Sequence, residues 1–259
     1  MKWLFLALGC ASLVRAQSFE VATIKPIVPG APHMAMGPRI LPGGRLVIED
    51  QTLKGMLVLA FHIAGWQIAG GDGWIAKQEY DVEAKPSGES RSRIKDLRAS
   101  WVYGIEDEHL RQLLQTLLID RFQLKFHREM KTGTIYVLEM SGKPIKLQPA
   151  THAGSASEGG FTGSIGFAGG RWGLFNTTMP RLAQFAADYE LHAPVEDRTN
   201  LSGAFDYRQP APLSDSDATT TDNTDSFLRL IPEIGLKLTR TTGQVEMFVI
   251  DRAEKPSAN

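Results

Sequence analysis

Cysteine is almost absent from this chain, which has 259 residues and a single cysteine, Cys10. An excess of either charge is also lacking, because 28 Lys and Arg nearly balance 29 Asp and Glu, for a formal net charge of -1. Such a balance offers no electrostatic footprint for a polyanion, which argues against nucleic acid as a partner. Beyond the N-terminal segment, no stretch has the roughly 20 apolar residues that a membrane helix needs, so no integral membrane segment is expected there.

The N-terminal segment MKWLFLALGCASLVRAQ has the three regions of a secretory signal peptide. Lys2 supplies the positive charge, residues 3–14 are apolar, and Val14 and Ala16 occupy the two positions that a signal peptidase reads. We predict that residues 1–16 are a signal peptide and that the protein is exported, to the periplasm or the cell exterior. The alternatives are a buried apolar helix and a lipoprotein anchored through Cys10. Cleavage after residue 16 would remove that cysteine and leave no disulfide and no thiolate metal ligand.

The chain repeats itself in three blocks that keep their order. GGRLVIEDQTLKGMLVLAF, from Gly43, aligns without a gap with GGRWGLFNTTMPRLAQFAA, from Gly169. EYDVEAKP aligns with AFDYRQPAP, and FQLKFHREMKTGTIYVLEM aligns with IGLKLTRTTGQVEMFVIDR. Because chance similarity would not preserve the order of separated blocks, we interpret them as an internal duplication.

Each copy shows the pattern β-α-β-β-α-β-β. A strand over 45–49 leads to Thr52, which can cap a helix whose apolar residues recur every three or four positions, and leucines over 110–118 mark a second amphipathic helix. Two closing strands are expected to meet at Lys131-Thr132-Gly133, a sequence typical of a hairpin turn. The predicted fold class is α+β, with two tandem copies of a mainly antiparallel sheet that carries helices on one face.

Composition indicates the domain boundaries. Residues 17–150 are predicted to form the first α+β unit and residues 169–259 the second. The Gly/Ser-rich segment 151–168 is predicted to be a flexible linker between them. The polar segment LSDSDATTTDNTDS, residues 213–226, is predicted to be a disordered insertion in the second unit.

Five further motifs follow one another along the chain: FEVATIKP, IAGGDGWIAKQEYDVEAKP, LLQTLLIDRFQLKFHRE, VEDRTNLSGAFDY and VEMFVIDRAEKPSAN. Together with the duplicated block, they resemble a family of secreted, soil-associated bacterial proteins of unknown function that is abundant in Acidobacteria. The resemblance implies relatives in which the module is fused to the membrane sensor metallopeptidase of beta-lactam resistance. The element order is also similar to the short N-terminal domains of secretins and TonB-dependent receptors, a likeness of fold alone. The family implies no activity and no catalytic residues.

The glycine-rich stretch GGDGW raises the question of a phosphate-binding loop. Gly71 and Gly73 match two glycines of the dinucleotide-binding pattern, but Ala76 replaces the third, and Asp72 would repel phosphate. The residues from Tyr80 onward alternate like a strand. We therefore interpret GGDGW as a connector before a strand.

Residues that could support catalysis or metal binding are scattered. Ser164 lies in TGSIG, which lacks the first glycine of a hydrolase elbow, and His127 with Glu129 is better explained as a surface pair on one strand than as a metal site. His62 is interpreted as a helix-end residue, and Glu106-Asp107-Glu108 as acids at the positive end of a helix. We predict no catalytic residue, no metal site and no cofactor. The ligand-binding residues stay unknown.

Four tryptophans could line a sugar- or peptide-binding groove or could cap the core: Trp66, Trp74, Trp101 and Trp172. The favoured function is an exported, non-enzymatic module of the cell envelope that binds or senses an unknown envelope protein or ligand. The alternatives are an exported hydrolase that acts on polysaccharide or peptide at an unrecognised site, and a structural subunit of an envelope assembly.

An aromatic-Asp pair follows the connector in both copies. Tyr80-Asp81 aligns with Phe205-Asp206, whereas only Gly203 corresponds to the glycines of GGDGW. We predict that each carboxylate accepts a hydrogen bond from turn backbone, so that its replacement by alanine lowers stability.

Overall fold

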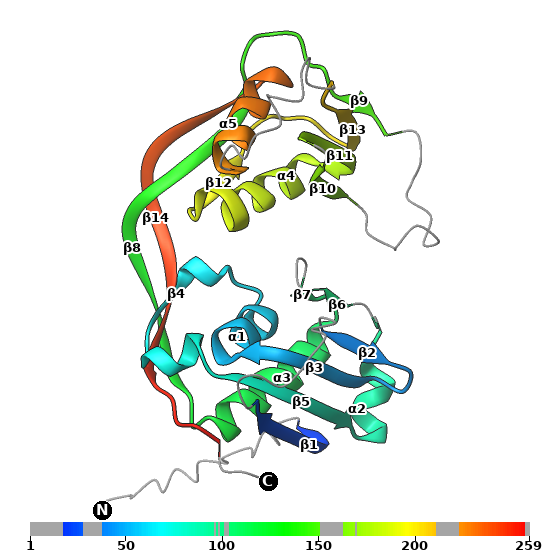
Figure 1. Ribbon diagram of the computed structural model, residues 1–259, viewed down its shortest axis with the longest axis vertical. Coiled ribbons are helices and arrows are strands. Elements are labelled where there is room, and N and C mark those ends of the chain that lie inside the picture. The colour runs from blue at the N-terminus through cyan, green and yellow to red at the C-terminus, as the bar shows by residue number, and fades with distance from the viewer. Residues whose placement is uncertain are drawn as a thin grey trace, which may run out of the picture. The chain divides into compact units, whose positions relative to one another are not determined.

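The computed structural model describes residues 18–27, 38–95, 97, 99–100, 104–150, 163–168, 170–210 and 223–256. Helices alternate with strands of mainly antiparallel sheets, which confirms the predicted α+β class (Figure 1). The elements in chain order are β1 (Phe19–Pro26), β2 (Arg39–Leu41), β3 (Arg45–Thr52), α1 (Leu53–Phe61), β4 (Ile68–Gly70), β5 (Glu79–Pro86), α2 (Gly88–Arg93), β6 (Ala99–Ser100), β7 (Gly104–Ile105), α3 (Glu108–Arg121), β8 (Lys125–Met140), β9 (Gln148–Pro149), β10 (Ser164–Ala168), β11 (Arg171–Thr178), α4 (Met179–Phe185), β12 (Val195–Asp197), β13 (Ala204–Arg208), α5 (Asn223–Glu233) and β14 (Leu236–Arg252).

The chain forms two compact units, and each unit is assembled from separated stretches of sequence. The first unit holds the residues up to Ile63, then Gly71–Phe126, and those from Ile250 onward. The second unit holds Ala64–Gly70 and His127–Val249. The sequence-based boundaries at residues 150 and 169 divide the chain differently, because they follow composition and not the pairing of distant strands.

The first unit is built on a four-stranded sheet in the order β1-β5-β3-β2, with every neighbour antiparallel. Strand β5 alternates between buried and exposed side chains, which gives the sheet one apolar face. The helices α1 and α3 contact each other and bury the apolar stripes that their sequence spacing predicts. The fully buried core residues of these elements include Leu46, Ile48, Met56, Tyr80, Val82, Leu113 and Phe122.

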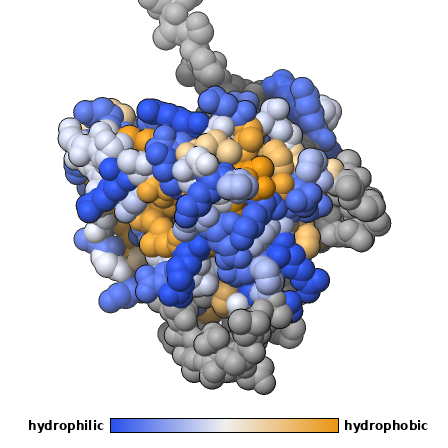
Figure 2. Space-filling view, turned by 90° about the horizontal axis from the view of Figure 1, so that it is seen from above, coloured by the Kyte–Doolittle hydropathy of each residue, from blue (hydrophilic) through white to orange (hydrophobic). Residues whose placement is uncertain are grey.

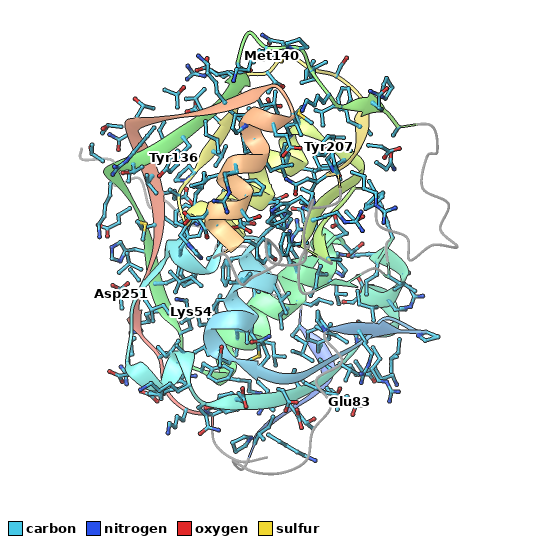
Figure 3. All side chains as sticks on the ribbon, turned by 45° about the horizontal axis from the view of Figure 1, so that its top comes forward. Lys54, Glu83, Tyr136, Met140, Tyr207 and Asp251 are labelled. Carbon is cyan, nitrogen blue, oxygen red and sulfur yellow. The ribbon has the colours of Figure 1, made fainter. Side chains whose placement is uncertain are left out.

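The second unit is built on a sheet in the order β10-β11-β13-β9. Its core centres on Trp172, which is 2% exposed and contacts Phe185 of α4 and Phe227 of α5 with ring centroids 5.9 Å and 5.3 Å away. Tyr207 lies beside α5 (Figure 3) and donates a 2.6 Å hydrogen bond to the Glu233 carboxylate. Burial and the neighbouring Glu233 raise the pKa of Tyr207, so this phenol stays protonated and acts as a donor.

A third sheet, in the order β12-β8-β14-β4, contains the two longest strands. Strand β8 is continuous over Lys125–Met140, so the predicted hairpin at Lys131-Thr132-Gly133 is wrong. Instead, β8 runs antiparallel beside β14, as the bonds from Arg240 to Thr134 and from Gln244 to Thr132 indicate. Gly133 is not a turn residue here: a Cβ atom at Gly133 would lie 3.2 Å from Val245, so the glycine leaves room for the neighbouring strand.

Two predicted polar segments contain ordered structure. The last five residues of the predicted linker form β10, which pairs with β11 from Ser164↔Phe175 to Ala168↔Arg171. The last four residues of the predicted insertion open α5, where the Ser226 hydroxyl accepts a 3.0 Å hydrogen bond from the Trp172 indole. The rest of both segments lies outside the described residues, as does the predicted signal peptide.

The helices α1 and α4 begin and end in the same way. Thr52 and Thr178 occupy the N-cap positions, and each hydroxyl accepts a hydrogen bond from a backbone N–H three residues on. The two helical segments end at His62 and His192, both in the left-handed conformation. His62 is therefore the helix-end residue that the sequence predicted.

Asp81 and Asp206 also play matching roles. Asp81 accepts a 3.2 Å hydrogen bond from the Asp50 backbone N–H, and Asp206 accepts one of 2.6 Å from the Asn176 N–H. Asp50 and Asn176 are left-handed, with φ of 51° and 48°, and each lies where the register of its strand shifts. The carboxylates thus satisfy backbone at β-bulges in a neighbouring strand, rather than in the glycine-rich connector.

Candidate functional site

A cavity of about 520 Å³ lies in the first unit between the end of α2 and the start of α3. Its volume is in the range that holds a small ligand. The lining residues are polar or charged: Arg93, Lys95, Glu106, Asp107, Glu108, His109 and Gln112.

Asp107 fixes the relative position of the two walls. Its Oδ1 accepts a 2.8 Å hydrogen bond from the Leu110 N–H and caps α3, at the positive helix end where the sequence analysis placed these acids. Its Oδ2 accepts a 2.7 Å bond from the Lys95 N–H, twelve residues earlier in the chain. One buried carboxylate therefore joins the segment after α2 to the N-terminus of α3.

The cavity presents groups of both charges. Arg93 and Lys95 come from the α2 side, whereas Glu106 and Glu108 flank the cap of α3. Arg93 forms a 2.7 Å ion pair with Glu89, and Glu108 accepts a 3.2 Å hydrogen bond from Gln112. Both of these contacts are at the exposed surface, so a ligand can replace them at little cost.

His109 has a ring nitrogen without a hydrogen-bond partner among the described residues. Its Nε2 is buried, and no described residue lies within hydrogen-bonding distance and geometry of it. Leaving a buried polar atom unsatisfied costs about 1–3 kcal/mol, so such atoms in folded proteins are usually bonded to water or ligand. His109 is therefore a lining residue whose ring nitrogen has hydrogen-bonding capacity that the described residues leave unused.

A second unusual feature is a π-helical turn in the second unit, Ala186–Leu191, which continues α4. The corresponding α1 has nine residues in all, whereas α4 has seven and the turn adds six. The wider turn accommodates the extra residues before the chain ends the helix at His192, and π-turns are frequent at functional sites. Burial raises the pKa of Asp188, in this turn, to about 6, and the charges of Arg181 and His192 limit the rise.

Replacing Asp188 with asparagine is expected to stabilise the protein at neutral pH. The raised pKa means that the folded state keeps a proton that the unfolded state releases, so wild-type stability falls as pH rises from about 4 to about 6. Above this window the ionised Asp188 carboxylate destabilises the folded state to its full extent, which partial exposure limits to about 1 kcal/mol. Urea unfolding at pH 3.5 and pH 7.5 should show a gain for Asp188→Asn at the higher pH alone. An equal gain at both pH values would contradict this origin.

The structure places the other predicted residues apart from one another. GGDGW links β4 to β5 through a single 3-10 turn, Gly73–Ala76, which supports the connector interpretation. Ser164 lies in strand β10, and Glu129 of β8 forms a 2.6 Å ion pair with Lys131. Trp101 falls outside the described residues.

The remaining tryptophans do not share one groove-like cluster. Trp74 stacks on Phe122 of the first-unit core at 6.3 Å, with Lys255 above its ring. Trp172 is the centre of the second-unit core, and Trp66 is half-buried in a 3-10 turn of that unit. Trp172 thus belongs to the core, which is one of the two roles that the sequence left open.

Over the described ranges, no three His, Cys, Asp or Glu side chains come together in a way that could hold a metal ion. Over the same ranges, no helix combines the length and the apolar character needed to cross a membrane.

Neither the cavity nor the π-turn was predicted from the sequence. His109 stands alone in the sequence, and only the bond between Asp107 and Lys95 brings it beside the cationic segment. The sequence does contain one signal for the π-turn. In the ungapped alignment Asp188 lies opposite His62, so His192 aligns with His62 only if the second helical segment is longer.

The fold and cavity define a small α+β protein with a polar ligand-sized site, and comparison with known proteins adds a family. Residues 54–253 match the family model described as a protein of unknown function (DUF3738). The chain therefore belongs to this family. No curated protein and no solved structure matches it.

Proposed function

We propose that this protein is an exported, non-enzymatic binding module of the cell envelope, with its ligand site in the cavity beside α3. The observation that carries the proposal is that His109 lines the cavity and has a buried Nε2 with no partner among the described residues. Export is supported by the charged, apolar and small-residue regions of residues 1–16. The sequence resemblance implies relatives in which this module is fused to a membrane sensor. Such relatives are consistent with a sensing role.

The cavity fits a small molecule that carries charges of both signs. Lys95 and Arg93 can meet a carboxylate, Glu106 and Glu108 can meet an ammonium group, and His109 can bond a neutral polar group between them. A short peptide with free termini has this chemistry. Such a ligand would gain orientation from the two charge pairs and affinity from satisfying the buried nitrogen.

Calorimetric titration of the purified mature protein with tetraalanine tests the proposal. We expect binding that becomes at least about tenfold weaker when both termini of the peptide are blocked, because each blocked end loses a charge-assisted contact. His109→Ala should weaken binding to a similar extent. The matched control is His127→Ala, an exposed histidine of the second unit. No heat of binding with free or blocked peptides, or equal loss in both variants, would refute this site.

The hydrolase alternative has one observation in its favour. A carboxyl with a pKa of about 6 can act as a general acid near neutral pH, and Asp188 has this property in a π-helical turn. Assays with a panel of polysaccharides and peptides would reveal such an activity as hydrolysis that Asp188→Asn abolishes. Turnover that survives this substitution would exclude Asp188 as the acid.

A further inference from the structure

Edge strands of β-sheets expose unpaired backbone groups, and proteins usually protect them with charge, proline or shortness. Most edges of this protein follow that rule. β1 carries Glu20, Lys25 and Pro26, β12 carries two acids, β9 ends in proline, and β2 and β4 have three residues each. These strands are poor templates for pairing with another chain.

β10 lacks every one of these protections. Its five residues, SIGFA, include no charge and no proline, and it is the outer strand of its sheet. In the part of the chain that the structure describes, it is the one edge strand longer than three residues without such a guard. The hydrophobic groups on the face shown in Figure 2 alternate with hydrophilic ones, so apolar area alone does not identify a docking surface there. An open backbone edge is a more specific feature.

We propose that β10 pairs antiparallel with β10 of a second copy of this chain, forming a two-fold dimer through a continuous sheet. A two-fold axis at Gly166 places Ile165 opposite Phe167 of the second copy and Ser164 opposite Ala168 of the second copy. Each apolar side chain then faces an apolar one, and no like charges meet. The strand is complementary to itself in this register.

The two faces of β10 fit this pairing. On the face toward the helices, Phe167 is 39% exposed and contacts Trp172 at 5.2 Å, while Ile165 packs partly against the core. A second Phe167 and Ile165 would extend this apolar row across the new boundary. On the other face, the residues are small, and the space around Gly166 is open, so nothing described there blocks a neighbouring strand.

The short contact sets the expected strength. Stable dimers usually bury at least about 1,000 Å² in total, and a pair of five-residue strands contributes only part of this area. We therefore expect reversible association that depends on protein concentration.

Sedimentation velocity over a wide concentration range tests the proposal with the mature protein. We expect a monomer–dimer equilibrium for the wild type and a dissociation constant raised at least about tenfold by Phe167→Lys. Exposed Ser164→Lys should act in the same direction, because it places two lysines along the new strand pair. Hydrogen exchange at β10 amides should slow as concentration rises.

The matched control is Phe175→Lys. Phe175 is 53% exposed and lies one strand inward on β11, so the same chemical change there should leave the dimer intact. Circular dichroism checks that each variant is folded. A wild type that stays monomeric at every concentration would overturn the proposal. So would a dimer that both lysine variants at β10 leave unchanged, since another surface or a different pairing would then hold it together.

Discussion

Replacing Gly235 with alanine is expected to lower the free energy of unfolding by about 3 kcal/mol or more. Gly235 joins α5 to β14 with φ of 93°, a conformation that L-residues rarely adopt. An added Cβ would lie 2.6 Å from the Pro144 carbonyl oxygen and 2.9 Å from the Ile145 Cα, so backbone would have to move. That movement also threatens the 3.0 Å bond from the Ser141 N–H to the Gly235 carbonyl.

Two other substitutions separate the clash from the backbone strain. Gly142 has φ of 79° but open space around it, so Gly142→Ala should cost only the strain, roughly 1 kcal/mol. Gln123 aligns with Gly235 and has φ of 46°, so Gln123→Gly should change stability little. Urea unfolding of the three variants measures the cost of the clash and the cost of the backbone strain separately. Equal losses for Gly235→Ala and Gly142→Ala would show that the close approach to Pro144 carries no cost.

Local sequence patterns predicted much of this fold because they reflect local physics. The caps at Thr52 and Asp107 and the apolar stripes of α1 and α3 depend on residues three or four positions apart. The matched roles of Asp81 and Asp206 could also be anticipated, since the two residues occupy the same place in the sequence blocks that align. The carboxylates act across neighbouring strands, however, and this partner could not be read from the sequence.

The features that the sequence did not reveal depend on distant partners. Lys131-Thr132-Gly133 has the composition of a turn, but pairing with β14 keeps β8 a single continuous strand. Gly243 of β14 gives matching room to Ile135, since a Cβ there would lie 2.5 Å from the Ile135 side chain. The cavity also depends on a distant partner, because Asp107 brings Lys95 beside α3. The spacing of these two residues in the sequence does not predict their hydrogen bond.

Removal of the bulge carboxylates should destabilise both units, and Asp206 should matter more. Asp206→Ala is expected to cost about 2 kcal/mol and Asp81→Ala about 1 kcal/mol, because each leaves a backbone N–H without its acceptor at a half-buried site. The order follows from the bond lengths, 2.6 Å at Asn176 and 3.2 Å at Asp50. Asparagine at either position keeps an acceptor oxygen and should recover part of the loss. Chemical denaturation followed by circular dichroism measures all four variants.

Glu83→Ala provides the matched control for the bulge carboxylates. Glu83 lies on β5 two residues after Asp81 (Figure 3), and its carboxylate forms a 2.8 Å ion pair with Arg45 at the exposed surface. Exposed ion pairs contribute little, so this substitution should cost less than about 0.5 kcal/mol. The two kinds of carboxylate should differ in the stability they contribute. Arg45 can turn to water when it loses Glu83, whereas the backbone N–H of a left-handed residue cannot reach water without losing the bulge. If Asp81→Ala and Asp206→Ala unfold no more easily than Glu83→Ala, the bulges hold their shape without these bonds.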